Sequence, residues 1–267
     1  MIATPKIIRS VLEKYLKYFT FRKTLPGRFP GNRVIYVSPG AQLKYLKFGE
    51  SSFDKVLLDI AEHFIDSNSV VWDVGANVGV FSLASAALGA QVVAMEPDPF
   101  LLALLNKSKG SQRNAGLNIS ILPIALGKDN SIERLQIANR GRASNALETS
   151  IGMKSQMGGV IETIDVPVMT LDTLLTSKLL PPTFLKIDVE GSEVDVLMGA
   201  RKILSEIRPT IFIEADVVTR PQVEEILRQY EYDFFESISE IKCGSGNVNT
   251  ITKKDTIAIP RFQSDLI

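Results

Sequence analysis

The sequence predicts a Rossmann-like doubly wound α/β fold, with a mostly parallel sheet that an antiparallel C-terminal hairpin completes. From residue 70 onward, short apolar runs alternate with segments of helical periodicity, which is typical of a parallel sheet covered by helices on both faces. The 267 residues are 45% hydrophobic and 22% charged, a composition typical of a globular domain. Because no internal repeat divides the chain, we expect one continuous domain.

The N-terminal residues differ from the rest in charge. Residues 1–50 contain ten Lys or Arg and two Glu, although the whole chain has 30 basic and 30 acidic residues. Apolar residues recur at helical spacing from Ile8 to Phe19 with basic residues among them, which predicts an amphipathic helix. We therefore divide the chain into a basic helical segment over 1–30, with a hinge at 25–31, and a domain over 31–267. The helix could pack on its own domain, bind an anionic partner or contact a membrane surface.

Two short strands and a helix are expected next. The strands are predicted at Val34–Val37 and Leu43–Phe48, and the helix has an apolar stripe from Phe53 to Phe64. His63, the only histidine, lies near this stripe. It has no partner for catalysis or metal binding nearby in the sequence, so we interpret it as structural or exposed.

The sheet follows in regular order. Its five parallel strands are predicted at Val70–Val74, Gln91–Met95, Ile119–Pro123, Phe184–Ile187 and Thr210–Ile213, and its last two strands at Tyr232–Ile241 and Asn249–Ile259, joined by the turn 244–247. Helices are expected after the first, second, fourth and fifth strands. After the third, alternating apolar residues around Leu135 and Val166 predict an extra pair of strands joined by a glycine-rich loop over 140–159.

A ligand of such a sheet binds at the carboxyl ends of the strands, where the strand order reverses. The first strand ends in Asp73-Val74-Gly75-Ala76-Asn77-Val78-Gly79. Gly75 leaves room for a ligand beside the backbone, Gly79 permits close contact between helix and strand, and Asn77 can cap the helix. At the end of the next strand, the Glu96 carboxylate can accept hydrogen bonds from two ribose hydroxyls.

The charge of this turn indicates which nucleotide it would hold. A pyrophosphate favours the G-x-G-x-x-G spacing and a helix start free of anions, whereas this turn reads G-x-x-x-G and follows Asp73. A carboxylate there suits a ligand with an ammonium and a sulfonium group, because opposite charges attract strongly when partly desolvated. The residues therefore favour S-adenosylmethionine over a nicotinamide dinucleotide. A tight turn that binds no ligand is the alternative.

Four further motifs accompany the glycine turn: Glu96-Pro97-Asp98, Leu171-Asp172-Thr173-Leu174-Leu175, Leu185-Lys186-Ile187-Asp188-Val189-Glu190-Gly191-Ser192-Glu193 and Leu197-Met198-Gly199-Ala200. Together they resemble the FkbM family of S-adenosylmethionine-dependent methyltransferases, which implies a fold of the class I methyltransferase type. The resemblance covers residues 31–215 and implies O-methylation of hydroxyl groups on sugars, glycans or other small molecules. It also implies that Asp73, Gly75, Asn77 and Glu96 hold the cofactor, with Ala76 and Gly79 in the same turn, and that Ala125 lies by the adenine.

Carboxylates are the candidates for catalysis. Methyl transfer to a hydroxyl needs aligned approach and a group that takes the proton. Asp188 and Glu190 follow the fourth strand, and Glu214 and Asp216 follow the fifth. We predict that Asp188 lies closest to the transferring methyl group and that Glu190 accepts the proton or orients the acceptor. Two alternatives remain: Asp188 and Glu214 could bind Mg²⁺ that orients a diol, although we predict no metal, or Glu190 and Glu193 could only favour a helix start.

The remaining residues narrow the acceptor. The fourth strand is not followed by the Asn/Asp-Pro-Pro-Tyr/Phe loop that methylation of base amino groups usually relies on. Methylation of cytosine C5 needs a thiolate nucleophile, and Cys243 stands in the terminal hairpin, away from the site. The neutral net charge also argues against a nucleic-acid substrate. We expect the loop over the cofactor to present Arg140, Arg142, Ser144 and Asn145 to the acceptor. A solvated loop, or a nucleotide-binding module without catalysis, is the alternative. The absence of a long apolar run and the single cysteine favour a cytoplasmic protein.

Overall fold

The computed structural model describes residues 19–151, 157–242 and 250–261 and has a seven-stranded sheet at its centre. The sheet consists of β3 (Val70–Val74), β4 (Gln91–Met95), β5 (Ile119–Leu122), β10 (Phe184–Ile187), β11 (Thr210–Glu214), β12 (Tyr232–Phe235) and β13 (Asp255–Pro260). The spatial order is β12-β13-β11-β10-β3-β4-β5. The strands from β11 to β5 are parallel, whereas β13 is antiparallel to both β11 and β12. The predicted fold class, with its antiparallel C-terminal pair, is confirmed.

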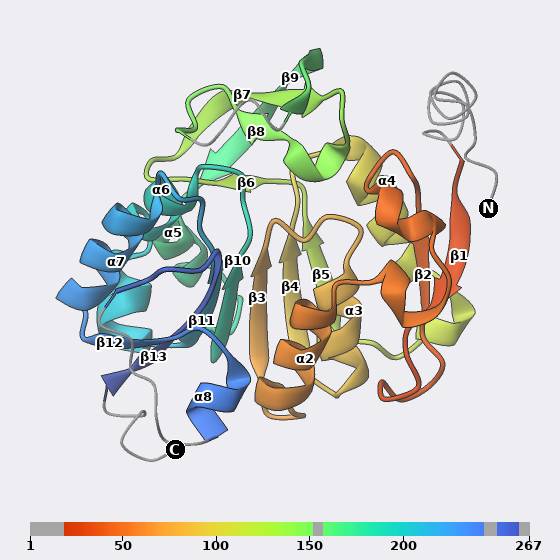
Figure 1. Cartoon of the computed structure of the whole chain (residues 1–267), viewed down its shortest axis with the longest axis horizontal. Helices are drawn as coiled ribbons and strands as arrows, with labels where there is room; N and C mark the ends of the chain where they lie inside the picture. The colour runs from red at the N-terminus through yellow and green to blue at the C-terminus, as the bar shows by residue number, and fades with distance from the viewer. Residues whose placement is uncertain (1–18, 152–156, 243–249, 262–267) are drawn as a thin grey trace.

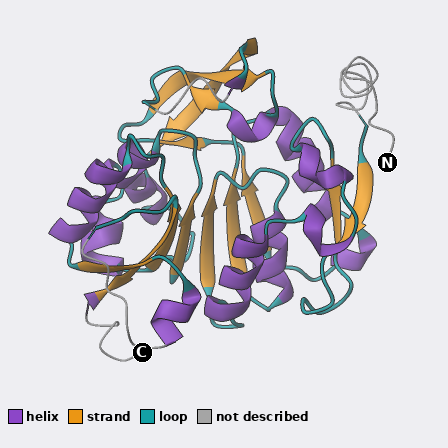
Figure 2. Ribbon diagram, in the orientation of Figure 1, coloured by secondary structure: helices purple, strands orange, loops and turns teal. Residues whose placement is uncertain are grey.

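Helices cover both faces of this sheet (Figures 1 and 2). They are α2 (Lys55–Phe64), α3 (Val80–Ala87), α4 (Pro99–Lys109), α5 (Leu171–Leu175), α6 (Glu193–Met198), α7 (Arg220–Gln229) and α8 (Ile238–Lys242). Successive strand residues point to opposite faces, so Val71 packs in the hydrophobic cluster with α2, α3 and α4 while its neighbour Trp72 packs in the cluster with α5, α6 and α7. The apolar character of β3, interrupted only by Asp73, follows from this burial on both sides.

A second sheet lies beyond the carboxyl ends of the central strands (Figure 1). It has the order β6-β9-β7-β8 and is formed by β6 (Ala125–Leu126), β7 (Ser131–Ala138), β8 (Ala146–Leu147) and β9 (Val160–Met169). The predicted extra pair is therefore present, with β7 antiparallel to β9. Its small hydrophobic cluster includes Leu135 and Val166. In the chain this sheet lies between β5 and β10, and it brings the segment 139–147 near the central sheet.

The segment before the central sheet differs from the prediction. Residues 1–18 lie outside the described residues, but residues 21–24 form β1 (Phe21–Thr24), which pairs with β2 (Val34–Val37). Leu25 and Phe29 are buried in the main core, so the stretch 25–31 is not a hinge. The helix predicted from Ile8 to Phe19 falls almost entirely outside the described residues and stays a prediction, whereas β1, Leu25 and Phe29 pack with the domain.

Several predicted elements differ from the structure. Leu43–Leu46 is a 3₁₀ turn with the bonds Tyr45 N to Gln42 O and Lys47 N to Lys44 O, because only Tyr45 in it is buried. β12 ends at Phe235, since Ile238 and Ile241 have helical spacing and form α8 instead. The predicted helix 194–204 is interrupted after α6, where a Cβ on Gly199 would lie 2.1 Å from the Gly127 carbonyl oxygen. A π-helical turn, Ile203–Ile207, follows.

Candidate active site

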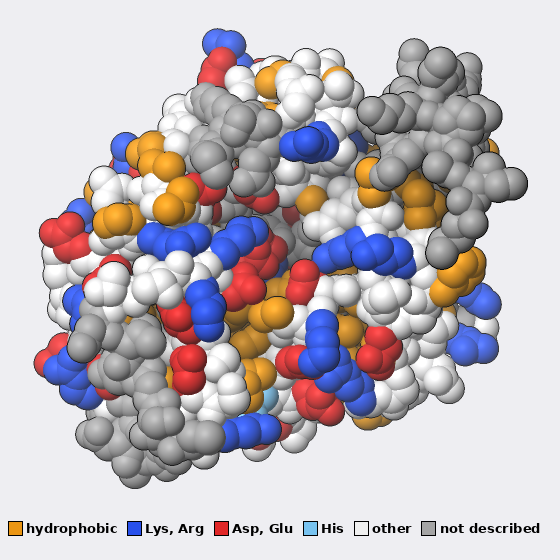
Figure 3. Space-filling view, viewed as in Figure 1, with side chains coloured by type: hydrophobic (Ala, Val, Ile, Leu, Met, Phe, Trp, Pro, Cys, Tyr) orange, Lys and Arg blue, Asp and Glu red, His pale blue; other side chains and the backbone are white. Residues whose placement is uncertain are grey.

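A cavity of about 540 Å³ opens at the carboxyl ends of β3, β4 and β10. The chain order reverses between β3 and β10, since β4 and β5 extend the sheet on one side of β3 and β10 and β11 on the other. Ligands of doubly wound sheets bind at such a point, and the volume suits a small molecule. Acidic and basic side chains surround the hollow in the middle of the face in Figure 3. Its lining comes from residues 41–44, 54, 57, 74, 75, 77, 96, 97, 101, 124–126, 135, 140–147, 188–190, 192, 214 and 254.

The turn after β3 is packed tightly between two neighbouring strands. The amides of Gly75 and Ala76 both donate to the Met95 carbonyl at 3.0 Å. Gly75 has φ +72°, and a Cβ there would lie 2.0 Å from the Asp188 carbonyl oxygen. A glycine is therefore required here for close contact with the end of β10, a reason that the sequence did not reveal. The predicted approach of a ligand to Gly75 stays a prediction. Gly75 still lines the cavity.

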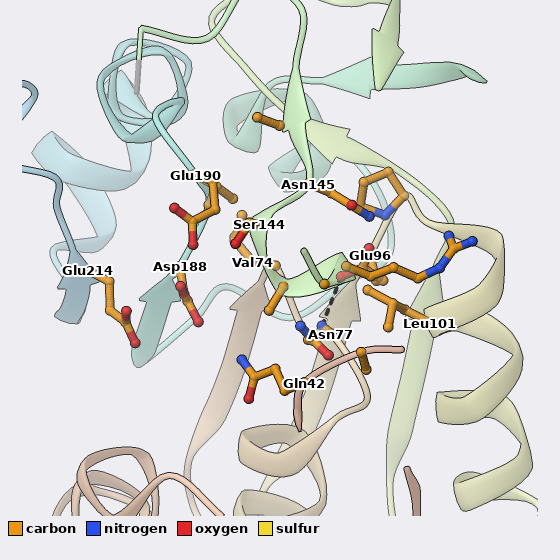
Figure 4. A pocket seen from close by; sticks show the side chains of 18 of the residues that line it. Gln42, Val74, Asn77, Glu96, Leu101, Ser144, Asn145, Asp188, Glu190 and Glu214 are labelled. Atoms are coloured by element: carbon orange, nitrogen blue, oxygen red, sulfur yellow. Dashed lines mark hydrogen bonds between the residues drawn. The ribbon is translucent and has the colours of Figure 1, made fainter. Parts of the chain in front are cut away.

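Asn77 and Glu96 are joined at the floor of the cavity (Figure 4). The Asn77 amide donates to Glu96 Oε2 at 2.8 Å, and the Asp98 amide donates to Glu96 Oε1 at 2.9 Å. Burial raises the pKa of the Glu96 carboxyl to about 7, against these two hydrogen bonds. Asn77 does not cap α3 as predicted: its Oδ1 accepts from the adjacent Val78 amide, and the N-cap is Gly79.

Three of the predicted cofactor residues do not line the cavity. Asp73 is fully buried below it, with its carboxylate 2.9 Å from Lys186 Nζ and 2.5 Å from Ser82 Oγ. Its charge is therefore neutralised inside the protein, and the predicted direct contact with a cationic cofactor is wrong. Gly79 is packed against Leu105, where a Cβ would lie 2.2 Å from Cδ1. Ala76 lines a small adjoining hollow, whereas Ala125 lies in the main cavity wall beside Ile124.

The predicted catalytic carboxylates meet on the other side of the cavity, where Figure 4 shows Asp188, Glu190 and Glu214. Burial raises the pKa of Glu190, and the nearby Asp188 carboxylate adds to this effect while Lys254 opposes it. Burial also raises the pKa of Glu214 to about 7, although its Oε2 lies 2.5 Å from Lys254 Nζ. Carboxylates with a raised pKa are suited to accept a proton near neutral pH.

Two other predictions for this edge have clear outcomes. Asp216 does not line the cavity; its Oδ1 accepts from the Val218 amide before α7. Glu193 is buried at the start of α6, where it accepts from the Gly191 amide and the Thr219 hydroxyl, both at 2.8 Å. No set of three or more His, Cys, Asp or Glu side chains in the described ranges is arranged to hold a metal ion.

The segment 140–147 carries the predicted acceptor residues, and all four line the cavity. Arg142 and Asn145 are occupied by Asp98: Arg142 Nη1 lies 2.8 and 2.7 Å from its two oxygens, and Asn145 Nδ2 lies 2.7 Å from Oδ2. Ser144 lies beside Asn145. Arg140 is exposed, and within residues 19–151, 157–242 and 250–261 its guanidinium pairs with no carboxylate. Arg140 is therefore the cation of this segment that can face an acceptor.

Several site residues were missed from the sequence. Gln42, Lys44 and Asp54 reach the cavity from the segment before the sheet, and Lys254 reaches it from the position just before β13. Lys186 and Asp98 were quoted within motifs but given no role. The signal for Lys186 was a lysine in a strand that is otherwise apolar, Phe184–Ile187, because a buried cation needs a carboxylate partner.

Comparison with known proteins agrees with this geometry. Residues 73–236 match the family described as methyltransferase FkbM domain. The chain is 27% identical over 223 residues to the hexuronic acid methyltransferase AglP of Haloferax volcanii, covering 81% of this chain and 79% of that protein. No helix among the described residues is long and apolar enough to cross a membrane.

Two solved structures are also similar. Methyltransferase FkbM from Methylobacillus flagellatus KT has 17% identity and a TM-score of 0.49 over 73% of this chain and 44% of that one. Precorrin-6y C5,15-methyltransferase from Geobacter metallireducens GS-15 has 14% identity and a TM-score of 0.41 over 76% and 82%. The chain thus spans less than half the length of the first structure. Since the family match includes the turn after β3, Glu96 and the carboxylates of the cavity, this chain belongs to the FkbM family of methyltransferases.

Proposed function

We propose that the chain is an S-adenosylmethionine-dependent O-methyltransferase that acts on a hydroxyl group of an acidic sugar in a glycan. One observation carries the proposal: a single cavity holds the Glu96 carboxylate near the turn after β3 and the Asp188 and Glu190 carboxylates across from it. The first can hold a ribose and the others can serve an acceptor hydroxyl. The relative named for a hexuronic acid supports the choice of an acidic sugar.

The donor half of the cavity fits an adenosyl group. Both Glu96 oxygens accept backbone amides, and each has a further lone pair for a ribose hydroxyl. The apolar side chains of Leu101, Ile124 and Ala125 line the cavity beside it and suit an adenine ring. When bound, S-adenosylmethionine supplies a methyl group on a sulfonium, which is electrophilic without metal or redox chemistry.

On the acceptor side, the chain orients the hydroxyl and takes its proton. Glu190 lines the cavity, and its raised pKa makes it a better proton acceptor than an exposed carboxylate. Asp188 is held at the end of β10 by Lys186 Nζ, 3.4 Å from its Oδ2. A fixed carboxylate there can accept a hydrogen bond from the acceptor and restrict its approach to one line.

The acidic part of the acceptor is assigned to Arg140. This side chain lines the cavity and is exposed, and it is not engaged by Asp98 as Arg142 is. A guanidinium binds a carboxylate through two parallel hydrogen bonds, which distinguishes an acidic sugar from a neutral one. The prediction of a cytoplasmic location and that of membrane contact by the N-terminal residues stay predictions.

The test uses the full chain with methyl-labelled S-adenosylmethionine and two oligosaccharides that differ only in a terminal glucuronic acid or glucose. We expect label to enter the acidic oligosaccharide and to survive mild alkali, because an ether is stable where a methyl ester is cleaved. Alkali-labile label would contradict a hydroxyl acceptor. Turnover of neither sugar, with intact donor binding, would contradict the substrate class.

Matched arginine variants test the recognition step. Arg140→Gln should raise KM for the acidic acceptor at least tenfold and leave KM for S-adenosylmethionine within twofold. Arg134→Gln is the control. Arg134 is also exposed and lies in β7 of the second sheet, but it pairs with Glu148 at 3.5 Å and does not line the cavity. Equal effects of the two variants would remove Arg140 from acceptor binding.

A further inference from the structure

Asp98 is a buried carboxylate that the reaction does not use. It is fully buried, and its Oδ1 accepts from the Phe100 amide at 2.8 Å as the N-cap of α4. The same carboxylate contacts Arg142 and Asn145, 44 and 47 residues further along the chain. An N-cap needs only one acceptor, so the other contacts require a separate explanation.

The segment 141–145 is held mainly by polar contacts. Its 3₁₀ turn, Arg142–Ser144, contains no buried residue. Its backbone is tied to the segment before α2 by two bonds, Arg142 N to Gly40 O at 3.0 Å and Ala143 N to Ala41 O at 3.2 Å. The guanidinium of Arg142 also lies over the Phe100 ring, 4.7 Å from its centroid. Because the turn buries no side chain of its own, its position depends on these contacts together with the side-chain bonds to Asp98.

This turn forms one wall of the donor half of the cavity. Ser144 and Asn145 lie across the cavity from Asn77 and Gln42 (Figure 4). Asp98 is also bound to the floor, because its amide donates to Glu96 Oε1 at 2.9 Å. The two acidic residues of Glu96-Pro97-Asp98 therefore have different contacts. The Glu96 carboxylate lines the cavity, whereas the Asp98 carboxylate binds Arg142 and Asn145 in the opposite wall.

We propose that Asp98 is a positioning residue that fixes the segment 140–147 across the adenosyl site and thereby sets the affinity and residence time of S-adenosylmethionine. The inference rests on the proposed function. The charge-assisted bonds of a buried carboxylate are strong, and they are formed by two side chains of the same short segment. Loss of the charge leaves Arg142 without its partner, so the wall opens and the donor dissociates faster.

Asp98→Asn is the informative variant, since asparagine caps a helix as well as aspartate and α4 should be retained. We expect Kd for S-adenosylmethionine and for S-adenosylhomocysteine to rise at least tenfold by calorimetry, with most of the change in the dissociation rate. KM for the donor should rise more than kcat falls. Amide hydrogen exchange should accelerate in residues 139–147.

Asp172→Asn is the matched control. The Asp172 carboxylate also accepts backbone amides, from Lys202 at 3.0 Å and Ile203 at 3.2 Å, but it lies outside the cavity. It should lower thermal stability without changing donor affinity. If Asp98→Asn does not fold, Arg142→Gln is the second variant, because it removes the same ion pair by changing its half-buried partner. It should raise Kd for S-adenosylmethionine by the same factor of at least ten.

The outcomes separate the two proposals. If the wild-type chain binds neither S-adenosylmethionine nor S-adenosylhomocysteine, the proposed function fails and the role of Asp98 fails with it. If the wild-type chain binds them and Asp98→Asn binds within twofold of it, only the role of Asp98 is overturned. Equal weakening by Asp172→Asn, or unchanged exchange in 139–147, would also overturn it, because the effect would then be general destabilisation.

Discussion

The ammonium of Lys186 lies 2.9 Å from the Asp73 carboxylate and 2.9 Å from the Gly75 carbonyl oxygen, with both charged side chains almost completely buried. Asp188 Oδ2 is 3.4 Å from the same nitrogen. Lys186 thus joins the end of β3 and the turn after it to the carboxylate that follows β10. Although burial opposes the charge, the carboxylates of Asp73 and Asp188 raise the pKa of Lys186 above its ordinary value. One buried cation therefore holds both halves of the site.

Replacement of Lys186 should lower the free energy of unfolding. Lys186→Met leaves the Asp73 charge buried without its partner, which costs about 3–5 kcal/mol in the free energy of unfolding. The double variant Asp73→Asn/Lys186→Met should lose less than the sum of the single variants, as measured by urea unfolding. The surface lysine Lys128, 3.9 Å from Asp195 and 55% exposed, gives the control: Lys128→Met should stay within about 0.5 kcal/mol of wild type. Additive losses would contradict the coupling.

Gly75→Ala should damage the site beyond its backbone strain. The new Cβ would lie 2.0 Å from the Asp188 carbonyl oxygen, so the turn or β10 must move and donor binding should fall at least tenfold. Gly116→Ala is the matched control, because Gly116 has φ +84° but no atom within 4 Å of the added Cβ. It should cost only the left-handed conformation, roughly 1–2 kcal/mol, with donor affinity unchanged. Calorimetry measures donor affinity and urea unfolding measures stability. Similar losses of donor affinity in Gly75→Ala and Gly116→Ala would show that the contact of residue 75 with Asp188 does not matter for binding.

Donor affinity should increase with pH through the range around 7. The pKa of Glu96 is raised to about 7 by burial, and ribose hydroxyls donate more strongly to the ionised carboxylate. Binding should therefore lower this pKa and release a proton, so that Kd falls from pH 6 to pH 8. Titrations in buffers of different ionisation enthalpy count the proton. Glu96→Gln should bind S-adenosylmethionine weakly at every pH. If Glu96→Gln kept the wild-type pH dependence, the titrating group would be a residue other than Glu96.

The rate of methyl transfer should depend on ionised Glu190. Since burial raises the pKa of Glu190, the deprotonated form that accepts the proton increases as the pH rises through this raised value, and kcat/KM for the acceptor should rise with it. Glu190→Gln should lower kcat about 10²–10⁴-fold and flatten the profile. The control is Glu193→Gln, whose buried carboxylate is tied to Gly191 and Thr219 outside the cavity lining. An unaltered rate in Glu190→Gln would exclude it as the base.

Much of the central fold could be predicted because its signals are local. β3, β4 and β10 begin and end at the predicted residues, since apolar runs between turn residues define strands that are buried on both faces. The 3₁₀ turn Leu43–Leu46 and the helix α8 could not be predicted, because a short apolar segment fits a strand as well as a helical turn.

The amino-acid sequence alone determined the order of strands and helices, the turn after β3 and the family, because these depend on residues near one another in the chain. It also predicted that Glu96, Asp188 and Glu190 lie at one edge of the sheet, where they line one cavity, since the carboxyl ends of parallel strands share an edge. Only the tertiary structure decided that Asp73 faces Lys186 and that Asp98 holds Arg142. Whether a carboxylate meets a ligand or a buried cation is set by partners more than forty residues away, and electrostatic pairing across such distances leaves no periodic trace in the chain.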